Sequence, residues 1–183
     1  SCTPPRWLFE KYPETRIVYA NKEQTEIFSR CHPCKSSPVM REKNRIITKK
    51  LGEAFGAHPA VIGWQIDNEI FPYNEGCYCE KCRAGFRAYL KEKYGTPENL
   101  NKKWGMARWS LAYKSFDEVI PPVRGRWEHP SLQTEWTRFH CRNIVSYVSE
   151  QAEILHNYTK APVGTDMMVT NLLSYYDINE HLD

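Results

Sequence analysis

VIGWQIDNE, residues 61–69, is the stretch of sequence that decides the fold. Its first six residues are nearly all apolar and too few for a helix, which is typical of a buried parallel strand. Asp67, Asn68 and Glu69 follow directly. In parallel α/β proteins functional groups gather at the carboxyl ends of strands, because the loops that follow the strands meet there. The stretch therefore predicts an α/β protein with a functional site at Asp67–Glu69.

Helices are predicted on both sides of this strand. Helical patterns cover about residues 39–55, 80–94 and 131–158, and another helix begins near Tyr176. The first has an apolar side, the face that usually packs on a core, made of Ile46, Ile47, Leu51, Ala54 and Phe55. A second strand runs from Pro162 to about Asp166, and Ile17–Tyr19 is a candidate third strand.

Alternating strands and helices of this kind predict right-handed βα units with parallel pairing. A closed (β/α)8 barrel needs about 250 residues, whereas this chain has 183. The fold class that we predict is therefore α/β, as a partial (β/α)8 TIM barrel.

The composition narrows the classes of function. The net charge is +3, from 25 basic and 22 acidic residues without a basic stripe, which argues against a nucleic-acid partner. No run approaches the roughly 20 apolar residues of a membrane span. The absence of a secretory leader, together with closely spaced thiols, predicts a reducing, cytoplasmic location. The 6 Trp, 11 Tyr and 7 Phe residues suit a packed core, and also the clefts in which flat rings stack on sugars.

Three cysteines lie within six residues, in Cys77-Tyr78-Cys79-Glu80-Lys81-Cys82. Neighbours this close cannot readily all form disulfides with one another, whereas they can converge on one ion. Zinc held by thiolates needs a fourth ligand, usually from another segment, and Cys31 and Cys34 are the candidates. Such a site, with four protein ligands, would hold two loops together. It would not take part in catalysis, because it has no open coordination position. The alternative is a set of free thiols. His140 and His156 are interpreted as helix-surface residues rather than as ligands.

Glu69 is the candidate for proton transfer. A Glu at the end of a buried strand can be partly desolvated, which keeps a proton available for a leaving-group oxygen. Asn68 beside it could hydrogen-bond a substrate hydroxyl. The alternative is a polar strand end that merely caps the next segment, and position alone does not separate the two.

Together these residues resemble glycoside hydrolase family 42, the β-galactosidases. The resemblance rests first on residues 64–69 and 77–82 and covers nearly the whole chain. The further matching segments are Pro4–Leu8, Phe86–Leu90, Tyr94–Thr96, Leu100–Gly105, Arg108–Ser110 and Phe116–Pro122. It implies one incomplete barrel domain over residues 1–183, spanning roughly strands two to five with their helices. It also implies retaining hydrolysis of terminal β-D-galactosides.

The resemblance assigns roles to particular residues. Glu69 matches the general acid/base, Asn68 its hydroxyl-binding neighbour, and Trp109 a tryptophan of the sugar site. The structural Zn²⁺ ligands found in many members match Cys34, Cys77, Cys79 and Cys82, which makes residues 23–38 and 71–82 zinc-binding loops. Cys34 is favoured over Cys31 because His32-Pro33-Cys34 aligns with a His-Tyr-Cys of the family.

Retention requires a second carboxylate, about 5–5.5 Å from the first. In the family this nucleophile is a Glu on a later strand, so it is expected beyond this chain, and the 183 residues alone are expected to be inactive. Asp166 also ends a strand, but the family usually has Asn there, so we interpret it as a substitution in the sugar-site wall. Members of the family are often trimers, which makes a homotrimer the expected assembly of the parent enzyme.

Two other functions stay open at this stage. One is a zinc-stabilised, non-catalytic binding or scaffold module in which Glu69 is structural. The other is a related barrel glycosidase with a different sugar preference, such as a β-glucosidase or an α-arabinosidase.

Overall fold

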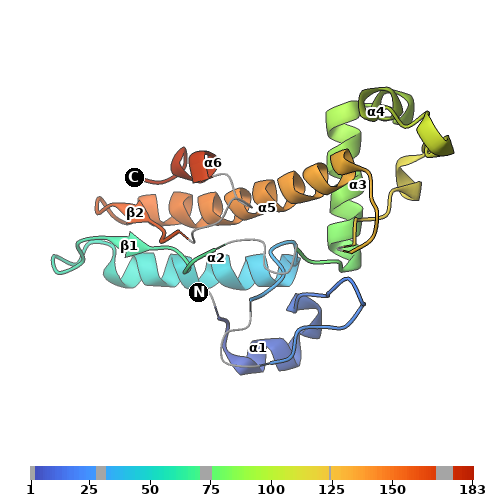
Figure 1. Cartoon of the computed structure of the whole chain (residues 1–183). Coiled ribbons are helices and arrows are strands. Elements are labelled where there is room, and N and C mark those ends of the chain that lie inside the picture. The colour runs from blue at the N-terminus through green and yellow to red at the C-terminus, as the bar shows by residue number, and fades with distance from the viewer. Residues whose placement is uncertain (1–2, 28–31, 71–75, 124, 168–174) are drawn as a thin grey trace.

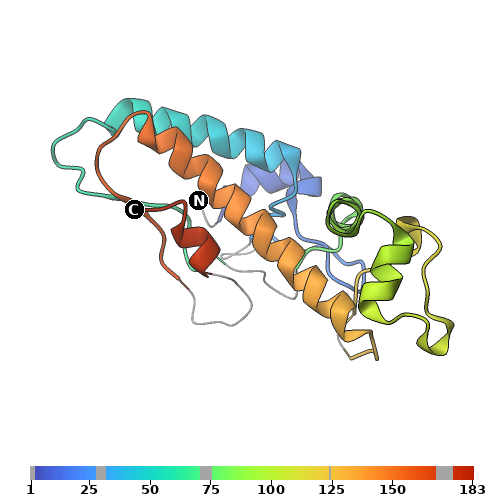
Figure 2. The same cartoon turned by 90° about the horizontal axis from the view of Figure 1, so that it is seen from above.

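Two long helices, α2 (Pro38–Phe55) and α5 (Pro130–His156), run side by side, and each is followed by a short strand (Figure 1, Figure 2). The strands are β1 (Trp64–Gln65) and β2 (Val163–Gly164). The structure is a computed structural model, and it describes residues 3–27, 32–70, 76–123, 125–167 and 175–183.

The two strands pair in parallel, with Trp64 opposite Val163 and Gln65 opposite Gly164. The chain between them contains α3 (Glu80–Tyr94), α4 (Pro97–Trp104) and α5. This helical crossover between parallel strands confirms the predicted α/β class. Within the described residues the sheet has these two strands only.

The candidate third strand at Ile17–Tyr19 is wrong. The described backbone there makes isolated antiparallel bridges, Arg16 to Pro33 and Val18 to Gln24. A short apolar run shows that a segment is extended, but it does not identify the partner, and here the partners are nearby loops rather than the sheet.

Local sequence signals explain where several helices begin and end. The Ser37 hydroxyl accepts the Met40 N–H at the start of α2, and the Thr96 hydroxyl accepts the Asn99 N–H at the start of α4. Each of these helices, and α5, has a proline in its first turn. Gly95 ends α3 with a positive φ of 74°.

The apolar side of α2 does not face the core of the described chain. Ile46, Ile47, Leu51 and Phe55 are 41–50% exposed, whereas the buried side consists of Met40, Asn44, Thr48 and Gly52. The small residues allow close packing, since a Cβ on Gly52 would lie 2.7 Å from the Tyr158 ring. The polar face is therefore the one that packs inward, and the apolar stripe lies outside.

Two apolar cores flank α5. One lies where α3 crosses the beginning of α5 (Figure 1) and includes Phe86, Leu90, Leu100, Trp136 and Phe139. The other lies between the strands and the rest of α5 and includes Ile66, Ile144, Tyr147, Val148 and Val163.

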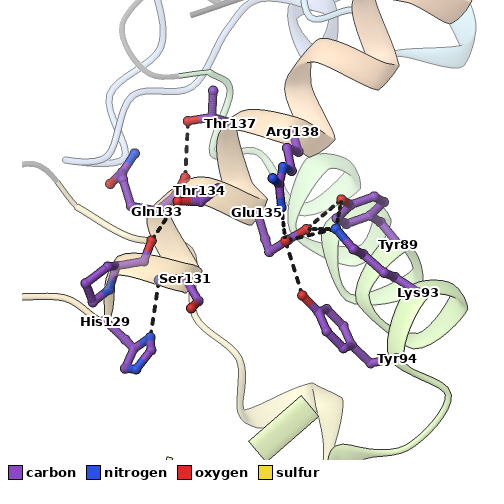
Figure 3. Close-up of polar contacts among 11 residues, drawn as sticks. Tyr89, Lys93, Tyr94, His129, Ser131, Gln133, Thr134, Glu135, Thr137 and Arg138 are labelled. Atoms are coloured by element: carbon purple, nitrogen blue, oxygen red, sulfur yellow. Dashed lines mark hydrogen bonds and ion pairs between the residues drawn. The ribbon is translucent and has the colours of Figure 1, made fainter. Parts of the chain in front are cut away.

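A buried carboxylate, Glu135, ties α3 to α5 (Figure 3). It accepts hydrogen bonds from Tyr89 Oη at 2.6 Å and Tyr94 Oη at 3.1 Å, and it pairs with Lys93 and Arg138, each at 2.8 Å. These donors hold the Glu135 pKa below its usual range, although burial alone would raise it. Burial and the hydrogen bond to Glu135 also raise the pKa of Tyr89.

The remaining elements are short. They are α1 (Arg6–Lys11), α6 (Tyr175–Asn179) and three 3₁₀ turns, at Pro13–Thr15, Arg108–Ser110 and Phe116–Glu118. Among the described helices none combines the length and the apolar character needed to span a membrane.

Candidate functional site

The carboxyl ends of β1 and β2 meet, and acidic side chains follow both strands. The Ile66 N–H donates to the Gly164 carbonyl at 2.7 Å, and the Thr165 hydroxyl donates to the Ile66 carbonyl at 2.6 Å. The pairing thus extends past the strands and places Asp67–Glu69 beside Asp166. This edge is where site residues of parallel barrels lie.

Asp166 holds the backbone of Glu69. Its Oδ1 accepts the Glu69 N–H at 2.9 Å and the Gln65 side-chain amide, also at 2.9 Å. The same Gln65 amide donates to the Asp67 carbonyl at 3.2 Å. Asp166 therefore holds the backbone amide of Glu69 in place. Nothing in the local sequence signals this contact, because the two residues are 97 positions apart.

Asp67 is a buried, paired carboxylate. Its Oδ2 lies 3.1 Å from Lys35 Nζ, with the two side chains 1% and 10% exposed, and its Oδ1 accepts the Asn68 N–H at 2.9 Å. Burial alone would raise the pKa of Asp67, but the charge of Lys35 and its hydrogen bond hold that pKa below the usual range. Lys35 Nζ also lies 4.4 Å from the centre of the Tyr147 ring. Lys35 was not among the residues predicted from the sequence.

The turn that carries Glu69 has an unusual backbone. Asp67 and Glu69 both have positive φ angles, 59° and 46°. Only a few per cent of non-glycine residues adopt this left-handed region, Asp more readily than Glu. Such conformations persist where surrounding contacts hold them, and they cluster at functional sites. Glu69 and Asn68 are both half-buried.

Four cysteines from two segments form a tight cluster. The Sγ atoms of Cys34, Cys77, Cys79 and Cys82 all lie within 4.8 Å of one another. Cys34 Sγ is 3.5 Å from Cys82 Sγ and 3.7 Å from Cys79 Sγ. Sulfurs about 2.3 Å from one zinc ion would be about 3.8 Å apart along the edges of a tetrahedron. Since a disulfide is only about 2.05 Å long, the spacing fits ligands of one metal ion rather than a bridge.

The four thiols of the cluster interact strongly with one another, and these contacts lower the pKa of Cys77 and Cys79 but raise that of Cys34 and Cys82. The Val18 N–H donates to Cys77 Sγ at 3.4 Å, and Ser36 Oγ lies 3.2 Å from Cys82 Sγ. Four adjacent thiolates need a cation to offset their charge, so the donor set fits a metal such as zinc.

A small cavity of about 30 Å³ adjoins the cluster, and His140 is one of the residues that line it. His140 is buried, which lowers its pKa to about 3, and its Nε2 has no hydrogen-bond partner among the described residues. A Cβ on Gly76, which has a φ of 104°, would lie 2.2 Å from that nitrogen. The interpretation of His140 as a surface residue is therefore wrong, because the segments around Cys34 and Gly76 pack against this part of α5. His156 is exposed, as expected.

Some predicted site residues are only partly described. Trp109 lies in the 3₁₀ turn Arg108–Ser110, but its side chain is not described. Cys31 and the segments 28–31 and 71–75 of the predicted zinc-binding loops also lie outside the described residues. The structure places Cys34 in the cluster and leaves the roles of Trp109 and Cys31 as predictions.

A family model, curated relatives and solved structures all match the chain to the same family. The model of glycoside hydrolase family 42, described as beta-galactosidase, matches residues 1–183. Beta-galactosidase BgaA of Clostridium cellulovorans is 38% identical over 99% of this chain, and the match covers 28% of that protein. The solved structure of a beta-galactosidase from Halorubrum lacusprofundi has a TM-score of 0.93 and 34% identity, over 100% of this chain and 28% of that one. The beta-galactosidase of Bacillus circulans sp. alkalophilus gives a TM-score of 0.91 at 29% identity, with the same coverage.

Proposed function

Because this chain belongs to glycoside hydrolase family 42, the β-galactosidases, we propose that the complete protein hydrolyses terminal β-D-galactosides with retention of configuration. The chain spans 28% of the length of the relatives cited above. The observation that carries the proposal is the position of Glu69 at the carboxyl end of β1, in a turn held by Asp67 and Asp166. A strained, held turn with an acidic side chain is suited to precise proton transfer.

In the proposed reaction Glu69 acts twice. As an acid, its carboxyl group gives a proton to the glycosidic oxygen while a second carboxylate attacks the anomeric carbon, and the leaving group departs as an alcohol. As a base, the Glu69 carboxylate then takes a proton from water, whose oxygen attacks the anomeric carbon and releases the second carboxylate. Asn68 would bind a substrate hydroxyl, and Trp109 would form part of the sugar site.

We assign the second carboxylate to a Glu outside these residues rather than to Asp166. The Oδ1 atom of Asp166 already accepts hydrogen bonds from the Glu69 N–H and from Gln65. Both bonds hold the backbone and side chain of the β1 edge rather than a substrate, so the contacts of Asp166 favour a structural role in the turn.

We assign structural Zn²⁺ to Cys34, Cys77, Cys79 and Cys82, on the strength of their sulfur spacing. The ion would join the loops 23–38 and 71–82, and with four thiolate ligands it would have no open position for chemistry. A site of this kind needs reduced thiols, which supports a cytoplasmic location. A homotrimer remains the assembly that we expect, and the molar mass in solution would test it.

The test is a comparison of the complete protein with its Glu69→Gln variant on lactose, whose glucose leaving group needs a proton to depart. The proposal predicts robust hydrolysis by the unaltered protein and a loss of roughly 10²–10⁴-fold in the variant. A protein that binds galactosides with full affinity but has no turnover would indicate the binding module instead. Faster cleavage of a β-glucoside or an α-arabinoside would indicate a different sugar preference.

A further inference from the structure

The turn at Asp67–Glu69 needs support that its own backbone does not supply. Two of its three residues, Asp67 and Glu69, have left-handed φ angles. The Glu69 N–H is held by Asp166, from the neighbouring strand. The other end of the turn is held by the Asp67 side chain, whose Oδ1 accepts the N–H of Asn68.

The Asp67 carboxylate in turn depends on Lys35. Oδ2 of Asp67 lies 3.1 Å from Lys35 Nζ, and both side chains are almost fully removed from solvent. An ion pair buried in this way loses hydration on both sides, so it contributes little net stability compared with an apolar pair of the same size. An ion pair of this kind within the turn that carries Glu69 therefore points to a role other than stability.

Lys35 is itself rigidly placed. It follows Cys34 of the cysteine cluster, and the Cys34 carbonyl accepts the N–H of Ser37, the residue that caps α2. The Arg41 guanidinium donates to the Lys35 carbonyl at 2.8 Å, and the Lys35 ammonium lies over the Tyr147 ring of α5. The position of this ammonium is thus fixed by the cluster and by both long helices.

We propose that Lys35 and Asp67 are positioning residues, a buried ion pair that holds the backbone turn in the conformation that aims Glu69 at the leaving-group oxygen. The inference rests on the proposed function of Glu69. Neither residue exchanges a proton with the substrate. Removal of either charge leaves the other buried and unpaired, so the turn shifts to bring it a partner or water.

The consequence for catalysis is selective. A misplaced acid protonates the leaving group poorly, which matters for a basic leaving group such as the glucose of lactose. A 2,4-dinitrophenolate leaves without protonation, so its departure depends little on Glu69. General damage to the barrel would slow both substrates alike. The ratio of kcat/KM values for the two substrates therefore separates positioning from overall structural damage.

The experiment uses the complete protein with Lys35→Met, Asp67→Asn and Glu69→Gln variants. We expect Lys35→Met and Asp67→Asn each to lower kcat/KM for lactose by roughly 10–10²-fold, and for 2,4-dinitrophenyl β-galactoside by less than about 3-fold. The double variant should lose no more than the worse single variant, because the pair acts as a unit. Lys35→Arg, which keeps the charge, should retain most of the lactose activity.

Lys49→Met is the matched control. It removes an exposed lysine of α2 that pairs with Glu53 at the surface, so neither substrate should be affected. Asp67→Asn preserves the size of the side chain and an acceptor for the Asn68 N–H, and it gives a second measurement if Lys35→Met does not fold.

The outcomes separate the two proposals. The proposed function fails if the unaltered protein cleaves neither substrate. It also fails if the Glu69→Gln variant cleaves both substrates as fast as the unaltered protein. If Glu69→Gln shows the selective loss on lactose while Lys35→Met and Asp67→Asn do not, or lose activity equally on both substrates, the positioning role alone is refuted.

Discussion

Replacement of Glu135 by Leu should loosen the attachment of α3 to α5. Glu135 accepts hydrogen bonds from two tyrosine hydroxyls, at 2.6 and 3.1 Å. A hydrogen bond to a charged group contributes about 1.5–3 kcal/mol to stability. The Lys93 and Arg138 side chains are 37% and 59% exposed, so their ion pairs add only about 0–1 kcal/mol each. The two tyrosine bonds alone thus give a loss of free energy of about 3–6 kcal/mol, which overlaps the range of about 3–5 kcal/mol for removal of one partner of a buried pair.

Hydrogen exchange of the α3 amides is the suitable assay, because the complete protein need not unfold in one step. The expected loss of free energy makes hydrogen exchange of the backbone amides in residues 80–94 roughly 10²–10⁴-fold faster. The exchange rates of the α2 amides should not change. Glu92→Gln is the matched control, since Glu92 also links α3 to α5, through Arg142, but with both side chains more than half exposed. Equal and small effects of the two substitutions would refute the reasoning.

The same contact predicts a dependence on pH. The pKa of Glu135 is lowered in the folded protein, so the unfolded chain binds the proton more tightly. The stabilisation is therefore fully present above the pKa of an ordinary Glu, about 4.3, and it is lost as the pH falls through the lowered value. The hydrogen-exchange rates of the α3 amides in the Glu135→Leu variant and in the unaltered protein should therefore become more similar in this acidic range.

Two further predictions concern the cysteine cluster. Gly76→Ala should release zinc to a chelator faster, because the new Cβ would lie 2.2 Å from a buried ring nitrogen of His140, whereas Gly164→Ala has open space and should not. Cys82→Ser should reduce the zinc content per chain, measured by elemental analysis, and Cys141→Ser, which alters a buried cysteine outside the cluster, should leave it unchanged.

The sequence predicted those features that depend on local chemistry. The apolar run before Asp67–Glu69 identified β1, the helical spacing of apolar residues identified α2, α3 and α5, and the close spacing of Cys77, Cys79 and Cys82 identified the cluster. Each of these signals lies within a few residues of the feature that it specifies.

The features that the sequence missed depend on which segments meet. The side of α2 that packs inward carries Asn44, Thr48 and Gly52, because α5 and Tyr158 approach it closely. Amphipathic patterning shows which face of a helix is apolar, but it does not show which neighbour covers that face. His140 was misjudged for the same reason, since the segments around Cys34 and Gly76 pack against α5 at that point and bury a position that looked exposed.

The two buried carboxylates of the described chain, Asp67 and Glu135, differ in a way that bears on function. Glu135 pairs with cations that are 37% and 59% exposed, and it accepts hydrogen bonds from tyrosines on a regular helix, an arrangement that stabilises packing. Asp67 pairs with a lysine that is itself buried, and it lies in a left-handed turn two residues before Glu69. A fully desolvated pair beside a strained backbone is costly to maintain, and selection for stability alone would favour an apolar replacement. We therefore expect substitution of Glu135 to affect chiefly α3 exchange, and substitution of Asp67 to affect chiefly the leaving-group dependence of catalysis.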